Sequence, residues 1–254
     1  MNSAQKFEKV TIFIFAANET NALRETVNSI CTECSDEDLE EILIVAKNTE
    51  CPSYSEAKKI IFENNNPKIK LYVQKAPTIE LCAAELPPMV KSSHFVIMVG
   101  DMEMNPKDLK VFIQKAKKHP QRIICAAKWH KDSQIIGYGN FREFGSRMMN
   151  SFISILFGRN VKDPFSVYQI YPISVYNQMN FDKPESFAFE YTLKPLRCGI
   201  EYEEIPTVYR NRVEGKTNFN YKKLFSTAIL FFLTAVRLRF SSKKKLLASD
   251  DKNK

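Results

Sequence analysis

VTIFIFAA, residues 10–17, is a run without charged residues that is rich in β-branched and aromatic side chains. A strand with one wet face alternates apolar and polar residues, whereas a strand buried on both faces, as in a parallel sheet, reads as a nearly continuous apolar run. We therefore interpret this segment as a doubly buried strand. EILIVA at 41–46 and HFVIMVG at 94–100 have the same character and predict two more such strands.

Helical periodicity separates these strands. Leu23, Val27 and Ile30 recur at i, i+4 and i+7, which is the spacing of one face of an α-helix. Further elements are expected along the first half of the chain: helices over 54–62, 79–90 (interrupted at 87–88) and 106–118, and a strand over 69–73. Strands that alternate with helices form βαβ units around a mostly parallel sheet. Such sheets bind ligands beyond the carboxyl ends of their strands.

The second half of the sequence is less regular. The patterns predict strands over 123–127, 167–171 and 201–205, helices over 144–156 and 186–198, and a polar loop over 131–140. No linker, repeat or low-complexity tract interrupts the chain before its last part. We therefore expect an α/β fold in one continuous domain over residues 1–220, followed by a distinct segment over 221–254.

That last segment contains LFSTAILFFLTAV, residues 224–236, which carries no charge and is flanked by basic residues on both sides. A helix that spans a membrane needs about 20 apolar residues. Two interpretations stay open. The helix lies on an anionic membrane surface, where each nearby basic residue contributes about 1 kcal/mol, or it is a core helix with a solvated basic tail.

Composition and charge narrow the class of protein. Hydrophobic residues make up 44% of the 254 residues, which is enough for a sizeable core and excludes general disorder. The net charge of +8 favours anionic partners, although no nucleic-acid-binding module is recognisable. We expect no secretory signal and reduced cysteines in a cytoplasmic setting. Cys31 and Cys34 form a lone CxxC pair at a helix end, which argues against a metal or redox role.

The segment VGDMEMNP, residues 99–106, carries the strongest chemical signal. Asp101 and Glu103 stand two residues apart directly after a buried strand. If the segment stays extended, both side chains point to the same side. Two such carboxylates can hold a hard divalent cation that bridges the oxygens of a diphosphate. The alternative is that Asp101 or Asn105 caps the helix that follows Pro106.

No glycine-rich GxGxxG or GxxxxGKS loop follows any expected strand, so dinucleotide-binding and P-loop functions lack support. A nucleotidyltransferase, which is expected to carry such a loop after its first strand, is disfavoured for the same reason.

A series of short motifs follows one order along the chain. They are FAANE at 15–19, DME at 101–103, AKW at 127–129, Asp163, FE at 189–190, EIP at 204–206 and RVEGKT at 212–217. This order resembles the family 2 glycosyltransferases of the GT-A type, over roughly residues 8–220. The nearest branch includes the dolichol-phosphate-mannose synthases.

The resemblance implies a GT-A Rossmann-like three-layer sandwich that transfers a sugar, with inversion, from a nucleotide-diphosphate-sugar to a lipid-phosphate or glycan acceptor. It implies that Asp101 and Glu103 bind Mg²⁺ or Mn²⁺. It also implies a set of donor- and substrate-binding residues: Ala17, Asn18, Glu19, Lys47, Lys128, Trp129, Arg212 and Lys216. Arginine and lysine suit phosphate contacts. A role in polysaccharide biosynthesis at the inner face of a membrane would follow.

A catalytic base is required only for some acceptors. A sugar hydroxyl needs a carboxylate within hydrogen-bond reach, and Glu190, then Asp163, are the candidates that the resemblance supplies. A lipid phosphate is already anionic and needs no base.

The sequence also departs from the family pattern. Lys47 and Asn48 stand after the second strand, where the family has a carboxylate pair, and Lys128 stands where arginine is usual. These departures support the alternative of a catalytically inactive GT-A-like domain that binds a nucleotide or a partner protein.

Overall fold

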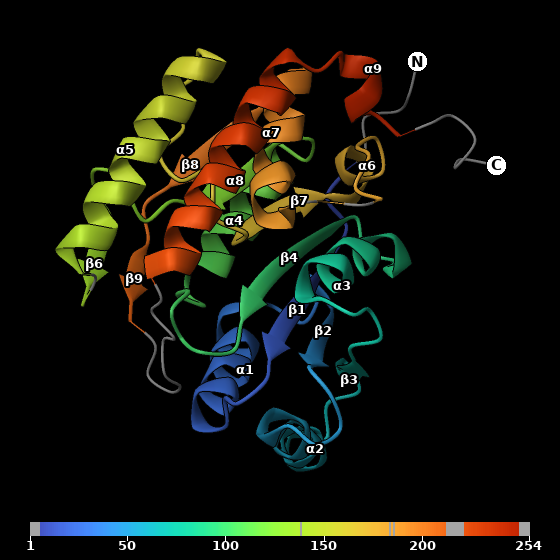
Figure 1. Cartoon of the computed structure of the whole chain (residues 1–254). Coiled ribbons are helices and arrows are strands. Elements are labelled where there is room, and N and C mark those ends of the chain that lie inside the picture. Colours follow the sequence, from blue (N-terminus) through green and yellow to red (C-terminus); the bar gives the residue numbers. More distant parts are fainter. Residues whose placement is uncertain (1–5, 138, 183, 185, 212–220, 249–254) are drawn as a thin grey trace.

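A seven-stranded sheet forms the centre of the molecule, with strand order β3-β2-β1-β4-β7-β5-β8 (Figure 1). The computed structural model describes residues 6–137, 139–182, 184, 186–211 and 221–248. The strands of this sheet are β1 (Val10–Ala16), β2 (Leu39–Ala46), β3 (Ile69–Val73), β4 (His94–Val99), β5 (Ile123–Ala126), β7 (Gln169–Pro172) and β8 (Tyr202–Ile205).

The sheet is mostly parallel, which confirms the expected fold class. β1 lies between β2 and β4 and pairs with both in parallel. β7 is antiparallel to its neighbours β4 and β5, and β8 is parallel to β5. Every residue of β1 is buried, because helices cover both faces of the sheet. The carboxyl ends of β2, β1 and β4 therefore meet at one edge.

Helices form the two outer layers. They are α1 (Asn21–Glu33), α2 (Pro52–Asn64), α3 (Ile79–Glu85), α4 (Asp108–Lys118), α6 (Ile173–Tyr176) and α7 (Phe187–Cys198), with a short 3-10 turn, η1 (Pro87–Met89), after α3. Side chains of α1, α2 and α4 share one core with one face of the sheet. Side chains of α3, α6 and α7 share a second core with the opposite face. The alternation along β1 divides its side chains between the two: Ile12 and Ile14 enter the first core, whereas Phe13 and Phe15 enter the second.

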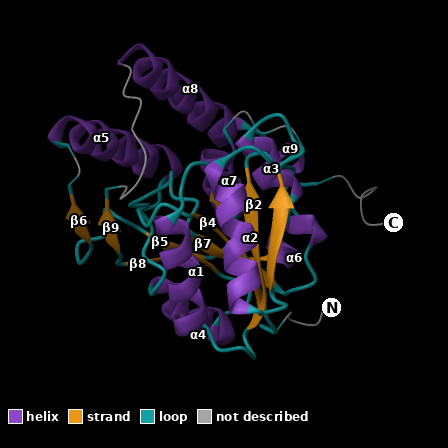
Figure 2. Cartoon of the chain, turned by 90° about the horizontal axis from the view of Figure 1, so that it is seen from below, coloured by secondary structure: helices purple, strands orange, loops and turns teal. Residues whose placement is uncertain are grey.

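A third core joins α7 to three further helices, α5 (Asn140–Phe157), α8 (Tyr221–Phe240) and α9 (Lys243–Leu246). α5 and α8 lie side by side on the outside of the molecule (Figure 2), and the rings of Phe152 and Phe232 stack with centroids 4.8 Å apart. Thr234, Ala235 and Leu238 are buried on the inner side of α8. The C-terminal helix thus packs against the core along one side. None of the helices among the described residues combines the length and apolarity needed to cross a bilayer.

The structure corrects the expected polar loop over 131–140. This stretch contains a strand, β6 (Gln134–Ile136), which pairs in parallel with β9 (Val208–Arg210), and α5 begins at Asn140 rather than at residue 144. β6 has only three residues and none of them is buried, so its apolar pattern is too short to indicate a strand. Its partner lies far along the chain, and only the folded structure shows the pairing.

Gly100, the residue that follows β4, is required by close packing. A Cβ atom at this position would lie 2.9 Å from Leu23 Cδ1 and 3.3 Å from Ile14 Cγ2. We expect Gly100→Ala to lower the free energy of unfolding by about 1–3 kcal/mol, the usual cost of overpacking a core. Urea denaturation measures this change.

Gly145 in α5 provides the matched control. A Cβ there meets nothing within 4 Å, so Gly145→Ala should stabilise the protein by about 0.5–1 kcal/mol through the better helix propensity of alanine. Equal stability changes at the two positions would contradict the close-packing account.

Candidate active site

The turn that leaves β4 carries two acidic residues, Asp101 and Glu103. Asp101 is fully buried, and its Oδ1 accepts the backbone N–H of Glu103 at 3.1 Å. Met102 between them adopts a left-handed backbone with φ 61°, which is uncommon for a residue other than glycine. The segment is therefore a tight turn rather than the extended stretch expected from the sequence. Helix α4 begins at Asp108 after Lys107, so Asp101 does not occupy its N-cap.

This turn contacts the short strand β9. The backbone N–H of Arg210 donates to the carbonyl oxygen of Glu103 at 3.4 Å. Asn105 in the same loop and Asp108, the first residue of α4, are held by residues that flank strands: the hydroxyl of Tyr168, just before β7, donates to the Asn105 carbonyl at 2.8 Å, and the hydroxyl of Thr207, just before β9, donates to the Asp108 carboxylate. The two carboxylates of the turn thus stand on a fixed loop beside β9.

The donor set of this turn fits a particular kind of cation site. Among the described residues, no group of three or more His, Cys, Asp or Glu side chains could hold a metal ion. Mg²⁺ is commonly held by one or two protein carboxylates together with substrate phosphates and water, rather than by an all-protein cage. Asp101 and Glu103 therefore fit a cation that binds together with a diphosphate.

The carboxyl ends of β1 and β2 contribute the neighbouring wall of this edge. The Glu19 carboxylate is buried and accepts the backbone N–H of Ala17 at 2.7 Å and that of Asn18 at 3.0 Å. Glu19 thereby closes its own turn and fixes the backbone of both residues. Lys47 follows β2; its N–H donates to the Ala16 carbonyl at 3.1 Å and its side chain is exposed. The structure therefore places these four expected residues at the same edge of the sheet.

Lys128 and Asp163 form a half-buried ion pair after β5. The Asp163 carboxylate accepts the backbone N–H of Lys128 at 3.1 Å and contacts Lys128 Nζ at 3.2 Å. The same ammonium lies 5.6 Å from the centre of the Tyr209 ring. Tyr209 precedes Arg210, which bonds to the Glu103 carbonyl. β9 therefore connects the Lys128 ion pair with the two-carboxylate turn.

Trp129 lies between two cations. Its ring centre is 5.9 Å from Lys128 Nζ and 4.7 Å from the guanidinium carbon of Arg147 on α5. Cation–π attraction holds such groups over the ring face. The indole is buried, so its contribution in this structure is to support the two cations beside it. Arg147 was not anticipated from the sequence, because it looks there like an ordinary solvated charge on a helix.

Glu190 lies in the first turn of α7 and is buried. Its carboxylate pairs with Lys194 at 2.6 Å and with Arg237 of α8 at 3.4 Å. Glu190 and Asp163, the two residues expected to supply a base, thus both form ion pairs in this structure. Arg212 and Lys216, the expected phosphate-binding cations, lie outside the described residues.

Glu204 of β8 is a site residue that the sequence alone did not single out. Its carboxylate accepts the backbone N–H groups of Lys162 at 2.8 Å and of Asp163 at 2.9 Å. Burial raises the pKa of Glu204 to about 7, against the opposing effect of these two hydrogen bonds. The only signal in the sequence is its place in the motif EIP at 204–206.

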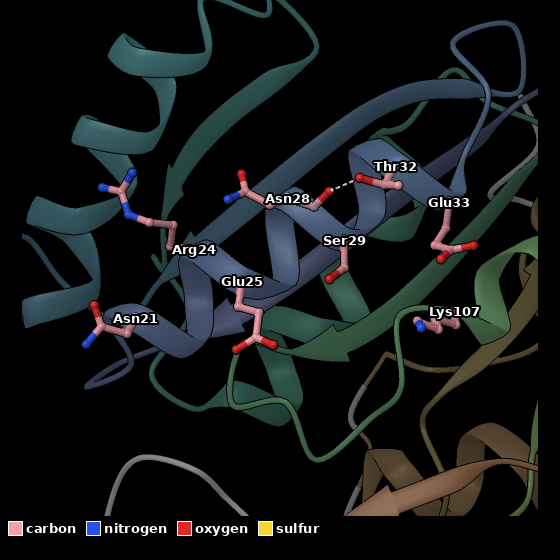
Figure 3. A pocket seen from close by; sticks show the side chains of 8 residues that line it. All are labelled: Asn21, Arg24, Glu25, Asn28, Ser29, Thr32, Glu33 and Lys107. Atoms are coloured by element: carbon pink, nitrogen blue, oxygen red, sulfur yellow. Dashed lines mark hydrogen bonds between the residues drawn. The ribbon is translucent and has the colours of Figure 1, made fainter.

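Three surface hollows among the described residues are lined by residues other than those of the two-carboxylate turn. One of about 510 Å³ runs along the outer side of α1, with Lys107 facing it from the loop before α4 (Figure 3). Two others, of about 480 and 440 Å³, lie beside α6 and beside the C-terminal end of α5. Neither Asp101 nor Glu103 lines any of the three. The α1 hollow mixes acidic and basic side chains, such as Glu25 and Arg24, and we assign no ligand to it.

Cys31 and Cys34 lie at the C-terminal end of α1, Cys34 at its C-cap. Burial raises the pKa of both, that of Cys34 to about 12. A nucleophilic or metal-binding cysteine needs a lowered pKa, so the raised pKa of both thiols does not favour such a role.

Comparison with known proteins identifies solved structures that have a similar fold. No known family profile matches the sequence. Among solved structures, the chain is similar to glucosyl-3-phosphoglycerate synthase from Mycobacterium tuberculosis. In its complex with Mn²⁺, uridine-diphosphate-glucose and phosphoglyceric acid, the TM-score is 0.69 at 11% identity, over 91% of this chain and 79% of that one. In its complex with Mg²⁺ and uridine diphosphate, the TM-score is 0.67 at 11% identity, over 90% and 79%.

A third structure of the same enzyme contains Mn²⁺, uridine-diphosphate-glucose and glycerol 3-phosphate. It has a TM-score of 0.66 at 10% identity, over 90% of this chain and 80% of that one. At these identities the likeness concerns the fold. The described chain has the GT-A Rossmann-like fold of these glycosyltransferases.

Proposed function

We propose that the protein is a divalent-metal-dependent glycosyltransferase that uses a nucleotide-diphosphate-sugar donor. The observation that carries this proposal is the turn at the carboxyl end of the central strand β4, in which Asp101 accepts the backbone N–H of Glu103. That edge is where open α/β sheets bind their ligands. Similar folds have been solved with uridine-diphosphate-glucose and Mn²⁺, which supports the same class of donor.

Each group at the edge has a role in this proposal. Asp101 and Glu103 would hold Mg²⁺ or Mn²⁺, and the cation would neutralise charge that develops on the departing diphosphate. The turn of Ala17, Asn18 and Glu19, with Lys47, would contact the nucleotide. Lys128 would contact the substrate on the other side, and the buried Trp129 would support its ammonium. Arg212 and Lys216, which lie outside the described residues, are proposed as further phosphate contacts.

We propose an acceptor whose attacking oxygen is already anionic, such as a phosphate on a lipid. Both carboxylates that could act as a base, Glu190 and Asp163, are engaged in ion pairs, and an anionic oxygen needs no proton removed. Solved structures of similar fold contain phosphoglyceric acid and glycerol 3-phosphate, which supports an acceptor that carries a phosphate; because both compounds also carry hydroxyl groups, the anionic attacking oxygen rests on the ion pairs alone. For a hydroxyl of a glycan, Glu190 and then Asp163 remain the proposed bases of an inverting displacement.

We further propose that α5 and α8 dock on an anionic membrane surface, which would bring the enzyme to a lipid-linked acceptor. Large apolar side chains are exposed on both helices at the spacing i, i+4, i+11, which places each set on one helical face. They are Phe144, Met148 and Ile155 on α5, and Ile229, Leu233 and Phe240 on α8. A cluster of this size on two adjacent helices marks an interaction surface rather than scattered exposure.

Basic residues lie at one end of this apolar face. The Arg239 guanidinium donates to the Leu156 carbonyl at 2.8 Å, so the C-terminal ends of α8 and α5 lie together. Arg159 follows α5 and Lys243, Lys244 and Lys245 form α9; all four are exposed. An apolar face with a basic end is complementary to an anionic bilayer. Co-sedimentation with anionic vesicles tests whether this face binds a membrane surface or a second copy of the chain.

The donor class is tested by thermal unfolding with nucleoside diphosphates of uridine, guanosine, thymidine and cytidine, with and without Mn²⁺. Binding at a hundred times Kd stabilises a protein by about 2.7 kcal/mol. For a chain of this length we expect one nucleotide to raise Tm by about 5–10 °C, and only when Mn²⁺ is present. No shift with any nucleotide would contradict the proposal.

The second candidate function is an inactive GT-A-like domain that binds a nucleotide or a partner. Lys47 in place of a carboxylate pair and the engagement of both candidate bases favour it. Release of free sugar or transfer of sugar to a phosphorylated acceptor, measured with the nucleotide sugar chosen by the thermal screen, separates the two. A metal-dependent shift in Tm without any turnover would support the inactive domain.

A further inference from the structure

We propose that Glu204 is a positioning residue of the substrate site. It fixes the backbone at residues 162–163 and, through Asp163, aims the ammonium group of Lys128 at a phosphate of the substrate. The phosphate comes from the donor diphosphate or from the acceptor, and the inference rests on the glycosyltransferase function proposed above.

The Glu204 carboxylate holds the backbone of residues 162 and 163. Oε1 accepts the N–H groups of both Lys162 and Asp163, at 2.8 and 2.9 Å, and Oε2 lies 3.0 Å from the Lys162 nitrogen. Hydrogen bonds from backbone N–H groups to an ionised carboxylate are among the stronger ones in proteins. The carboxylate on β8 thus anchors two consecutive residues that lie about forty positions earlier in the chain.

Asp163 in turn holds Lys128. Its two carboxylate oxygens contact the backbone N–H and the Nζ of Lys128. The side chain of Asp163 is 2% exposed and that of Lys128 is 17% exposed, so the ammonium is the half of the pair that a ligand can reach. This ammonium faces the ring of Tyr209, and the next residue on β9, Arg210, donates its N–H to the Glu103 carbonyl of the two-carboxylate turn. A shift of residues 162–163 would therefore move a cation at the substrate edge.

Protonation of Glu204 provides a way to test the link. Burial raises its pKa to about 7; the Asp163 charge acts in the same direction and Lys162 in the opposite one. Tyr202 and Cys125 also face this region, and burial raises the pKa of both out of the neutral range. As the pH falls through about 7, the carboxylate loses the charge that holds the two N–H groups, and phosphate binding should weaken.

The stability of the fold changes in the opposite sense. The folded-state pKa of Glu204 lies above its ordinary value of 4.5. Its contribution to stability is therefore complete below pH 4.5 and is lost as the pH rises through 7. Weaker binding at low pH therefore would not arise from this group's effect on unfolding.

The test compares Glu204→Gln with Glu203→Gln. Glu203 is the neighbour on β8, but its carboxylate pairs with Arg122 at 2.9 Å and with Lys115, away from residues 162–163. Calorimetric titrations use uridine diphosphate with Mn²⁺ as the donor probe and glycerol 3-phosphate as the acceptor probe, between pH 6 and 8.5. We expect Glu204→Gln to weaken one of the two probes about tenfold at pH 8, as for lost hydrogen bonds to a charged group.

The pH dependence of probe binding should distinguish Glu204→Gln from both wild type and the control variant Glu203→Gln. Wild type and Glu203→Gln should lose more affinity for the same probe than Glu204→Gln does as the pH falls through 7; the smaller loss left in Glu204→Gln comes from the phosphate of the probe, which itself titrates at about pH 6. The probe that responds shows whether the phosphate belongs to the donor or to the acceptor. Equal affinities of wild type and Glu204→Gln for both probes, with the same pH dependence, would overturn the proposal.

A second readout separates this inference from the proposed function. The backbone amide signals of Lys162 and Asp163 in NMR spectra should titrate with a midpoint near pH 7 in wild type and should not do so in Glu204→Gln. If these two amide signals change neither with pH nor with the substitution, the positioning role is overturned, whether or not the probes bind. Amides that respond in a protein that binds neither these probes nor any of the other three nucleoside diphosphates contradict the glycosyltransferase function instead.

Discussion

Asp101→Asn is expected to remove the Mn²⁺-dependent part of nucleotide binding and to lower sugar transfer by about a thousandfold, because a metal ion contributes several kcal/mol to stabilising a charged leaving group. The carboxamide keeps an oxygen in the place where Asp101 Oδ1 accepts the Glu103 N–H. The turn should therefore persist while the negative charge is lost. Calorimetric titration of the nucleotide with and without Mn²⁺, together with turnover, measures both effects.

The same loop and its neighbour provide comparisons. Glu103→Gln should produce a loss of similar kind, since both carboxylates belong to the proposed cation site. Glu50→Gln, an exposed acid in the loop after β2, should leave metal dependence and turnover unchanged. The thermal unfolding of all three variants without nucleotide should match that of wild type. Normal turnover by Asp101→Asn would remove the metal site and with it the proposed mechanism.

Replacing the exposed apolar residues of the two outer helices is expected to abolish membrane binding. The double variant Ile155→Ser and Leu233→Ser changes one residue on α5 and one on α8, with exposed fractions of 82% and 58%. Burying a large apolar side chain contributes about 1.5–3 kcal/mol. We therefore expect at least about a tenfold loss of affinity for vesicles that contain anionic lipid. Co-sedimentation measures it.

Deletion of the C-terminal segment would not serve the same purpose. Ala235 and Leu238 are buried against the core, and the ring of Phe231 stacks on that of Phe189 with centroids 5.4 Å apart. Removing α8 would uncover this core, so loss of binding would not distinguish a membrane surface from unfolding. Point substitutions at exposed positions avoid that ambiguity.

Phe62→Ser is the matched control. Phe62 is 87% exposed on α2, which lies far from α5 and α8 (Figures 1 and 2), so its removal should not change vesicle binding. Neutral vesicles should bind wild type more weakly than anionic ones, because the exposed lysines of α9 favour anionic headgroups. A stable dimer in solution that the double variant dissociates, with no binding of wild type to vesicles, would assign the face to a second copy of the chain.

Local patterns in the sequence predicted most of the framework. The run at 10–17 and its counterparts at 41–46 and 94–100 became β1, β2 and β4, because apolar β-branched runs of this length are stable only when both faces are buried. Leu23, Val27 and Ile30 became the buried side of α1. The carboxylates of 101 and 103 were correctly placed at the carboxyl end of β4. Their backbone was not, since a left-handed residue at Met102 has no signature in its side chain.

The interactions that define the site connect residues far apart in the chain. Lys128 meets Asp163 across 35 positions, Lys162 meets Glu204 across 42, and Glu190 meets Arg237 across 47. No local pattern encodes such pairs, because each member alone looks like a solvated charge. The burial of Asp163 and Glu190, which makes their pairing necessary, exists only in the folded state.

The amino-acid sequence by itself determined the alternation of strands and helices, the mostly parallel sheet and the edge at which two carboxylates end the central strand. These follow from the burial of short segments, and each segment carries its own pattern. The tertiary structure alone decided which charges are neutralised, that Glu204 holds residues 162–163, and that α8 packs on one side while exposing the other. Those outcomes depend on which surfaces meet, and desolvation gives a charge its partner only after the chain has folded.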